Sequence, residues 1–391
     1  MEALLAAEVT ACGASDVNPA AAGVAFRGEM GVCWRVNLES RTASRVLMQM
    51  ARVPYKTERD VYDATHAVDW PSQFGVARSI RVDVNAIKCP LKSLDFVTLR
   101  IKDAVCDRFR EALDRRPNVD TREPDVRIHG FLDAEQFILY LDTSGEPLYK
   151  RGWRSKVGEA PLKENLAAGM VMLTGWDRVE PLFDPVCGSG TLLIEAALMA
   201  LSIPPGSRRT FGFEKLSRHD PARWAAVRNA AMAKAQAPRP LEIYGSDNSA
   251  VEVARARTNL EAAGLTGCIM LQHADVLEVP APAAAGVLIA NPPYGVRIGQ
   301  ATELAAFYPA LGNAFKARYT DWRCYVFSAD AELAGLIRLK PSMRTPLFNG
   351  PLECRLYEYR MIEGSLRRAK RAKPAATGTA SRDHNPPVKA G

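Results

Sequence analysis

Gly286-Val-Leu-Ile-Ala-Asn-Pro-Pro-Tyr-Gly-Val-Arg-Ile-Gly299 is the stretch of this 391-residue sequence that decides its fold. An apolar run of strand type is followed by an amide, two prolines and an aromatic ring: Asn291, Pro292, Pro293 and Tyr294. A proline cannot donate to a sheet ladder, so the strand must end there. In open α/β sheets, ligands bind beside the carboxyl ends of the strands. The stretch therefore predicts a ligand site.

The groups after this strand suit a planar ligand that bears an amine. The Asn291 side-chain oxygen and a backbone carbonyl can accept hydrogen bonds from an exocyclic NH2, and the Tyr294 ring can stack on a base. The alternative is an ordinary end of a strand, because Asn-Pro commonly initiates turns. A second motif upstream favours the ligand site.

That second motif is Pro181-Leu-Phe-Asp-Pro-Val-Cys-Gly-Ser-Gly-Thr-Leu-Leu-Ile-Glu-Ala-Ala. A strand ends at Asp184 and a helix begins near Thr191. Gly188 and Gly190 let the backbone turn tightly and approach a ligand. The free N–H groups of the helix point at the same turn.

Acidic residues end the next two predicted strands. Asp247 can accept hydrogen bonds from both hydroxyls of a ribose, and Asp275 can accept one from an adenine amine. A dinucleotide site would have a third glycine in the turn and an acid ~20 residues on. Here Leu193 stands at the third glycine position, and Asp247 lies far downstream. A cofactor with a sulfonium and no phosphates therefore fits better than a dinucleotide.

Two regions of different character follow from the patterning. Strands and helices alternate from Leu162 onward, which predicts an α/β domain with a mostly parallel sheet. Residues 1–152 show a mixed α+β pattern that includes a hairpin at 126–142. There we expect an alternating, strand-like stretch from Gly31 to Leu38, and a helix from Arg41 to Met50 that brings Arg41, Arg45 and Arg52 close together.

The composition, 47% hydrophobic and 24% charged, is that of a soluble globular protein. No apolar run approaches the ~20 residues of a membrane span, and the N-terminus lacks the basic start of a signal peptide. We therefore expect a cytoplasmic protein without a membrane partner. The eight cysteines and five histidines show no metal-ligand spacing, which predicts free thiols and no metal.

Positive charge gathers at the C-terminal end. Residues 364–391 hold seven Lys/Arg and one acid, which accounts for +6 of the net charge of +7. This composition cannot bury a core, so we expect a basic disordered tail. A second basic stretch, Leu148-Tyr-Lys-Arg-Gly-Trp-Arg-Ser-Lys-Val-Gly, is expected either to contact a phosphate backbone or to serve as a solvated connector.

The motifs together resemble those of class I S-adenosylmethionine-dependent methyltransferases of the Asn-Pro-Pro-Tyr type. More narrowly, the chain resembles the THUMP-domain RNA guanine-N2 methyltransferases, and within them the N-terminal half of bifunctional bacterial enzymes that act on 23S rRNA. The matching segments of the second region are Asp184-Pro-x-Cys-Gly-Ser-Gly-Thr-Leu-Leu-Ile-Glu-Ala-Ala, Gly245-Ser-Asp, Ala254-Arg-Ala-Arg-Thr-Asn and Asn291-Pro-Pro-Tyr-Gly-x-Arg. Upstream they are Arg41-x-Ala-Ser-Arg-Val, Val105-Cys-Asp-Arg-Phe, Arg116-Pro-Asn-Val-Asp, Leu148-Tyr-Lys-Arg-Gly-Trp-Arg and Pro161-Leu-Lys-Glu.

The resemblance implies a Rossmann-like methyltransferase domain at 153–363, a ferredoxin-like segment at 1–40, a THUMP-like RNA-binding domain at 41–152 and the tail at 364–391. It implies S-adenosylmethionine as cofactor and structured RNA, rRNA or tRNA, as partner. The catalytic residues would be Asn291, Pro292, Pro293 and Tyr294. The cofactor-binding residues would be Asp184, Gly188, Ser189, Gly190, Asp247, Asn248, Asp275 and Asn291.

Two features depart from the family pattern. Relatives usually begin with a strand before the first helix, whereas this sequence opens inside that helix, and Val296 stands where relatives often carry Glu. Other readings also stay open. They are a tRNA guanosine or a nucleic-acid adenine N6 as the target, a non-catalytic RNA-binding relic of the fold, and a nicotinamide-dependent oxidoreductase.

Overall fold

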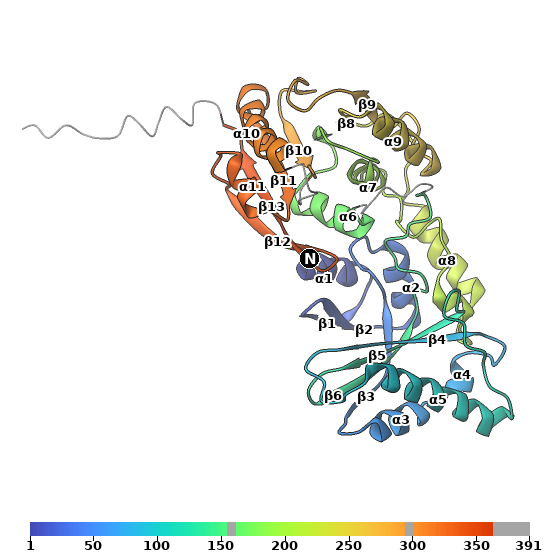
Figure 1. The fold of residues 1–391 in the computed structure, drawn as a ribbon. Helices are drawn as coiled ribbons and strands as arrows, with labels where there is room; N and C mark the ends of the chain where they lie inside the picture. The colour runs from blue at the N-terminus through green and yellow to red at the C-terminus, as the bar shows by residue number, and fades with distance from the viewer. Residues whose placement is uncertain (155–161, 294–300, 363–391) are drawn as a thin grey trace, which may run out of the picture.

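The computed structural model describes residues 1–154, 162–293 and 301–362. Two large β-sheets with their helices form the lower and upper parts of the molecule in Figure 1. The elements of the N-terminal part are α1 (Glu2–Ala11), β1 (Ser15–Ala20), β2 (Gly23–Arg27), α2 (Met30–Glu39), β3 (Leu47–Pro54), α3 (Glu58–His66), α4 (Trp70–Gln73), β4 (Ile80–Ala86), α5 (Leu94–Leu113), β5 (Val126–Leu132) and β6 (Gln136–Asp142).

The second part is built from longer strand–helix alternations. Its elements are α6 (Glu164–Leu173), β7 (Leu182–Asp184), α7 (Thr191–Ala200), the 3-10 helix η1 (Gly212–Lys215), α8 (Pro221–Met232), β8 (Ile243–Asp247), α9 (Ala250–Ala262), β9 (Met270–His273), β10 (Gly286–Ala290), α10 (Ala301–Arg318), β11 (Trp322–Ser328), α11 (Ala331–Leu336), β12 (Met343–Asn349) and β13 (Leu352–Arg360).

The N-terminal sheet has the order β3-β6-β5-β4. β5 and β6 form the predicted antiparallel hairpin, while β4 runs parallel to β5. A separate two-stranded hairpin, β1-β2, lies beside α1.

Two predicted elements of this part are wrong. Residues 31–38 belong to helix α2, because apolar residues that alternate over a short stretch also recur four apart and so fit one helix face. Residues 41–50 are not a helix but a loop that runs into β3. The Glu8 carboxylate accepts from the backbone N–H groups of Arg41 and Thr42. This long-range capture, together with the pairing of β3 and β6, outweighs the local helical pattern.

The second sheet confirms the predicted α/β fold. Its order is β12-β13-β11-β10-β7-β8-β9. The five strands from β9 to β11 pair in parallel, and β13 runs antiparallel to β11 and β12. All five residues of β10 are buried, as expected for a central parallel strand covered on both faces.

The insertion at 202–239 packs into the N-terminal core instead of the methyltransferase core. Its rings Phe213 and Trp224 lie 5.7 Å and 6.4 Å from Trp34 of α2, measured between centroids. Phe211 stacks on Phe213 at 5.3 Å, and α8 packs along α2 (Figure 1). The insertion thus joins the two parts of the chain.

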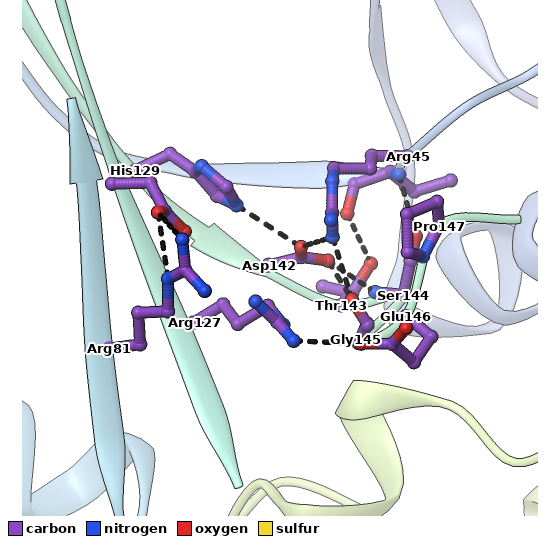
Figure 2. A network of polar contacts seen from close by, with 12 residues as sticks. Arg45, Arg81, Arg127, His129, Asp142, Thr143, Ser144, Gly145, Glu146 and Pro147 are labelled. Atoms are coloured by element: carbon purple, nitrogen blue, oxygen red, sulfur yellow. Dashed lines mark hydrogen bonds and ion pairs between the residues drawn. The ribbon is translucent and has the colours of Figure 1, made fainter. Parts of the chain in front are cut away.

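Polar contacts complete this joint (Figure 2). Arg45 and His129 both point at the buried Asp142, and His129 Nε2 lies 3.2 Å from its Oδ2. The next residues, 143–147, meet the insertion: Phe213 N donates to Thr143 O at 2.8 Å. The Arg209 guanidinium donates to four backbone carbonyls, those of Ser144, Glu146, Pro147 and Lys150.

Within the described ranges, no helix is both long and apolar enough to cross a membrane. All eight cysteines are free, and six are buried, as expected. Among the same residues, no three His, Cys, Asp or Glu side chains gather in a way that would hold a metal ion. The predicted tail, 364–391, lies outside the described residues.

Candidate active site

The predicted site residues gather at the carboxyl ends of β7, β8, β9 and β10. The chain runs outward from β7 to β8 and β9 on one side, and to β10 and β11 on the other. The strand order therefore reverses between β7 and β10, and a crevice opens at such a switch point. The two decisive motifs of the sequence end the two strands that flank this point.

The glycine turn after β7 has the geometry that the sequence predicts. Gly188 and Gly190 have φ values of +51° and +81°, which side chains rarely adopt. A Cβ on Gly190 would lie 3.2 Å from the Cβ of Ala256, so this glycine lets α9 approach. A Cβ on Gly188 would meet nothing within 4 Å. Gly188 therefore faces open space at the edge of the sheet.

Asp247 ties the ends of β7 and β8 together. Its Oδ2 accepts from Gly188 N at 2.9 Å, and its Oδ1 accepts from Ser249 N at 2.9 Å. Each carboxylate oxygen keeps a further lone pair. Asp247 thus holds the turn in place and can still accept from a ligand hydroxyl.

Asp184 holds the turn after β7 together through its side chain. Its side chain is buried, and Oδ1 accepts from Val186 N at 3.1 Å within the turn. Burial, with Asp247 nearby as a lesser cause, raises the pKa of the Asp184 carboxyl well above its usual value. Asp184 shapes the turn from beneath, and its neutral form is favoured.

The outer predicted residues lie on loops. Asn248 is exposed, and its backbone carbonyl oxygen lies 3.0 Å from His273 Nε2. Asp275 Oδ1 accepts from Leu277 N at 2.8 Å in the turn after β9. Asn248 follows β8 and Asp275 follows β9, so both lie at the same carboxyl edge of the sheet as the glycine turn after β7.

Asn291 leaves β10 with an unused acceptor. Its Oδ1 is buried, and no hydrogen bond from the described residues reaches it. Pro292 is buried behind it, and the Pro293 carbonyl accepts from Tyr308 Oη of α10 at 3.2 Å. A buried amide oxygen without a donor is costly, which marks it as a site for a ligand N–H. Tyr294 lies outside the described residues.

Asn259 of α9 was missed by the sequence reasoning as an individual residue. Its Nδ2 donates to Ser189 O at 3.0 Å, between the two glycines, and its Oδ1 is buried without a partner. The Ala254-Arg-Ala-Arg-Thr-Asn match ends at this residue and was the only signal for it.

The basic linker does not behave as expected over its described part. Arg151 and Trp153 are buried, and Arg151 Nε donates to Glu195 Oε1 of α7 at 3.2 Å. These two side chains are therefore neither a phosphate contact nor a solvated connector. A charge can be buried here because Glu195 and the carbonyls of Arg41 and Leu148 satisfy it.

A basic cavity of about 600 Å³ lies between the linker and the insertion. Its lining includes Lys150, Arg208, Arg209 and Arg228, with Glu146 as the acid, and none of the predicted site residues. The chemistry of the strand edge, not this cavity, therefore defines the candidate active site.

The donor set at the strand edge fits S-adenosylmethionine. The open turn at Gly188 can receive its amino-acid part, Asp247 can accept from its ribose, and Asp275 can accept from its adenine amine. Asn291 Oδ1 remains for the group that is modified. A Rossmann-like sheet with the reversed strand β13, and with this set of groups, defines a class I S-adenosylmethionine-dependent methyltransferase.

Comparisons with known proteins place the chain more closely. Residues 151–358 match the family of RMKL-like methyltransferase domains. Residues 55–142 match the THUMP domain, and residues 1–47 match the RlmL ferredoxin-like domain. Because the first match covers more than half of the sequence, the chain belongs to the RMKL-like methyltransferase family.

Among its relatives is the ribosomal RNA large subunit methyltransferase K/L of Shewanella frigidimarina, 39% identical over 370 residues, which are 93% of this chain and 52% of that protein. The chain thus spans about half the length of the curated relatives that it matches. SMU.472, which is named a putative methyltransferase and was solved in complex with SAH, has a TM-score of 0.83 at 29% identity, and the match covers 92% of this chain and 95% of that one. A Listeria monocytogenes structure, named a predicted N6-adenine-specific DNA methylase, has a TM-score of 0.83 at 30% identity, covering 92% of this chain and 93% of its own.

Proposed function

We propose that the protein methylates the N2 amine of a guanosine in RNA, with 23S rRNA as the substrate. The observation that carries the proposal is the buried, unpartnered Oδ1 of Asn291, at the end of β10 and beside the glycine turn. An acceptor in that position suits an N–H donor on the substrate, and an exocyclic base amine offers two.

The chain's own groups would hold and polarise this amine. The lone pair of the guanine amine is delocalised into the ring, so the nitrogen is a poor nucleophile. Asn291 Oδ1 and the Pro292 carbonyl would accept its two N–H groups and favour a more pyramidal nitrogen. Tyr294, in the undescribed stretch, is predicted to stack on the extruded base. When bound, S-adenosylmethionine supplies an electrophilic methyl group, and orientation provides much of the acceleration.

RNA as the substrate class is supported by two findings. The THUMP match precedes the methyltransferase domain, and relatives at 39% identity are named ribosomal RNA large subunit methyltransferases. The basic cavity offers Lys150, Arg208 and Arg228 for phosphate contacts. We also propose that the protein acts in the cytoplasm, as its composition suggests.

Methyl transfer to defined nucleic acids tests this proposal. The purified protein and labelled S-adenosylmethionine are incubated with unmodified 23S rRNA, tRNA or DNA, and the products are digested to nucleosides for mass spectrometry. We expect N2-methylguanosine from 23S rRNA alone, and we expect the Asn291→Ala variant to form it at least ~100-fold more slowly. N2-methylguanosine from tRNA alone would move the proposal to tRNA.

Methylation of adenine at N6 is the second candidate, because the Listeria structure of 30% identity is named for that activity. The same digestion separates the two, since N6-methyladenosine or its deoxy form would then appear in place of N2-methylguanosine. A protein that binds RNA and yields no methylated nucleoside on any substrate would be a non-catalytic relic.

A further inference from the structure

Arg154, the last described residue of the linker, ends beside the glycine turn. Its Nη2 donates to Thr191 Oγ1 at 2.9 Å. Thr191 directly follows Gly190, and its hydroxyl lies 3.4 Å from that of Ser189. The guanidinium therefore stands where the turn passes into α7, among the residues that face the amino-acid part of the cofactor.

Arg154 is fixed in this position by its other contacts. Nε donates to Glu164 Oε1 of α6 at 2.8 Å, and Nη2 also reaches Leu162 O at 3.2 Å. The guanidinium carbon lies 5.3 Å from the centroid of the Trp153 ring. Only 11% of the Arg154 side chain is exposed, so the group has little freedom to turn elsewhere.

One nitrogen of this fixed group is unpaired in the part of the chain that the structure describes. Arg154 Nη1 is shielded from solvent and has no hydrogen-bond partner among these residues. An unsatisfied buried donor on a charged group is among the more costly features of a fold. Arg41 Nη1 and Arg108 Nε are also buried without a partner in the described structure, but of these three nitrogens only that of Arg154 adjoins the glycine turn, where a ligand can supply the acceptor.

The missing acceptor should be an anion. Among the described residues, Glu164 is the one carboxylate paired with Arg154, and it meets Nε. The other two acceptors of the guanidinium, Thr191 Oγ1 and Leu162 O, are neutral and lie on Nη2, so Nη1 can still donate to a second anion. The part of S-adenosylmethionine that is anionic is the α-carboxylate of its methionine moiety.

We propose that Arg154 Nη1 donates to the α-carboxylate of bound S-adenosylmethionine. Asp247 and Asp275 take the adenosine part on the side of β8 and β9, and Arg154 closes the opposite end from the side of α6. The linker that leaves the N-terminal part thereby becomes a wall of the cofactor site and selects cofactors that carry a carboxylate.

Isothermal titration calorimetry with two ligands tests this assignment without any turnover. S-adenosylmethionine is compared with its decarboxylated form, which keeps the adenosine, the sulfonium and the amine. The wild-type protein should bind the complete cofactor about 10- to 100-fold more tightly, as for a hydrogen bond between charged groups. Arg154→Met should remove this preference, and it should bind the decarboxylated form at least as well as the wild type, because that form carries one more positive charge.

Three further variants serve as controls for the contact between Arg154 and the carboxylate. Arg154→Met/Glu164→Gln also removes the buried carboxylate that Arg154→Met alone would leave unpaired, so it reports the same preference in a better balanced fold. Arg154→Lys should retain part of the preference, and the exposed Arg52→Met should retain all of it. Equal losses for both ligands in the Arg154 variants, or a wild type that does not distinguish them, would overturn the proposal.

Discussion

The carboxyl edge of the methyltransferase sheet and the joint between the two sheets differ in how far their buried polar groups are paired, although the joint also has atoms that are unpaired among the described residues, such as Arg41 Nη1 and Trp34 Nε1. At the joint, Arg209 donates to four backbone carbonyls, and Arg151 donates to Glu195 and two carbonyls. At the edge, Asn291 Oδ1, Asn259 Oδ1 and Arg154 Nη1 have no hydrogen-bond partner within residues 1–154, 162–293 and 301–362.

This difference distinguishes buried polar groups that stabilise the fold from buried polar groups that can bind a ligand. A satisfied buried cation stabilises an interface and has little left to offer a ligand. An unsatisfied buried group costs stability, and a ligand can return it. Substitutions at the joint should therefore lower stability, whereas substitutions at the edge should lower binding or catalysis in a folded protein.

The largest effect is expected at the joint, for Arg151→Met. This change leaves Glu195, which is fully buried, without its counter-charge. Breaking a buried pair in this way costs about 3–5 kcal/mol of unfolding free energy. Denaturant titration followed by circular dichroism measures the loss.

Arg151→Met/Glu195→Leu is the matched control, because it removes both charges and leaves an apolar pair. It should recover most of the stability lost in the single variant. If the double variant were no more stable than Arg151→Met, the carbonyl contacts of Arg151, and not its pairing with Glu195, would hold the joint.

At the edge, Asn291→Ala should lower the single-turnover rate of methyl transfer by at least ~100-fold, the lower end for a positioned catalytic group. Its melting temperature should stay close to that of the wild type, because Oδ1 makes no hydrogen bond within the described structure. Rapid-quench measurement of methylated RNA, paired with thermal unfolding, checks both statements. A folded variant with the wild-type rate would exclude Asn291 from the reaction.

The residues of the carboxyl edge could be predicted from the sequence because they belong to short motifs, each next to the end of a strand. Two glycines with positive φ, a strand that stops at Asn-Pro-Pro, and acids after the neighbouring strands each lie within a few residues of the end of their own strand. Parallel strands then bring these short motifs to one edge automatically.

The joint could not be predicted, because its contacts link residues far apart in the sequence. Arg41 Nη2 donates to the carbonyls of Leu198 and Ile203 in the other part of the chain, and Glu8 holds the backbone of 41–42. The local sequence pattern therefore predicts a helix at 41–50 that the structure does not contain. Arg154 was missed for the same reason, since nothing in the linker sequence shows that it reaches Thr191.

Asp247→Ala tests a residue that we expect to have both roles: it stabilises the glycine turn, and it can bind the cofactor. Loss of hydrogen bonds to its carboxylate should weaken S-adenosylmethionine binding by about 1.5–3 kcal/mol in calorimetry. Loss of its bonds to Gly188 N and Ser249 N should also lower the melting temperature of the ligand-free protein. Asp247→Asn keeps one side-chain oxygen, so its cofactor affinity and its melting temperature should lie between those of the wild type and of Asp247→Ala. Unchanged affinity would reduce Asp247 to a purely structural residue.

The smallest effect is expected for Asp184→Asn, and it should depend on pH. Because burial raises the pKa of Asp184 in the folded state, the folded protein holds a proton that the unfolded chain loses above the ordinary pKa of about 3.9. The stability that this proton provides is complete below that pH and is lost as the pH rises toward the folded pKa. Asparagine does not titrate. The unfolding free energy of the variant, relative to that of the wild type, should therefore rise by up to about 1.4 kcal/mol per pH unit in this window. Subtracting the two unfolding free energies at pH 4.5 and 5.5 cancels the titration of all other groups. A difference that stays flat or falls with pH would show that Asp184 is ionised in the turn.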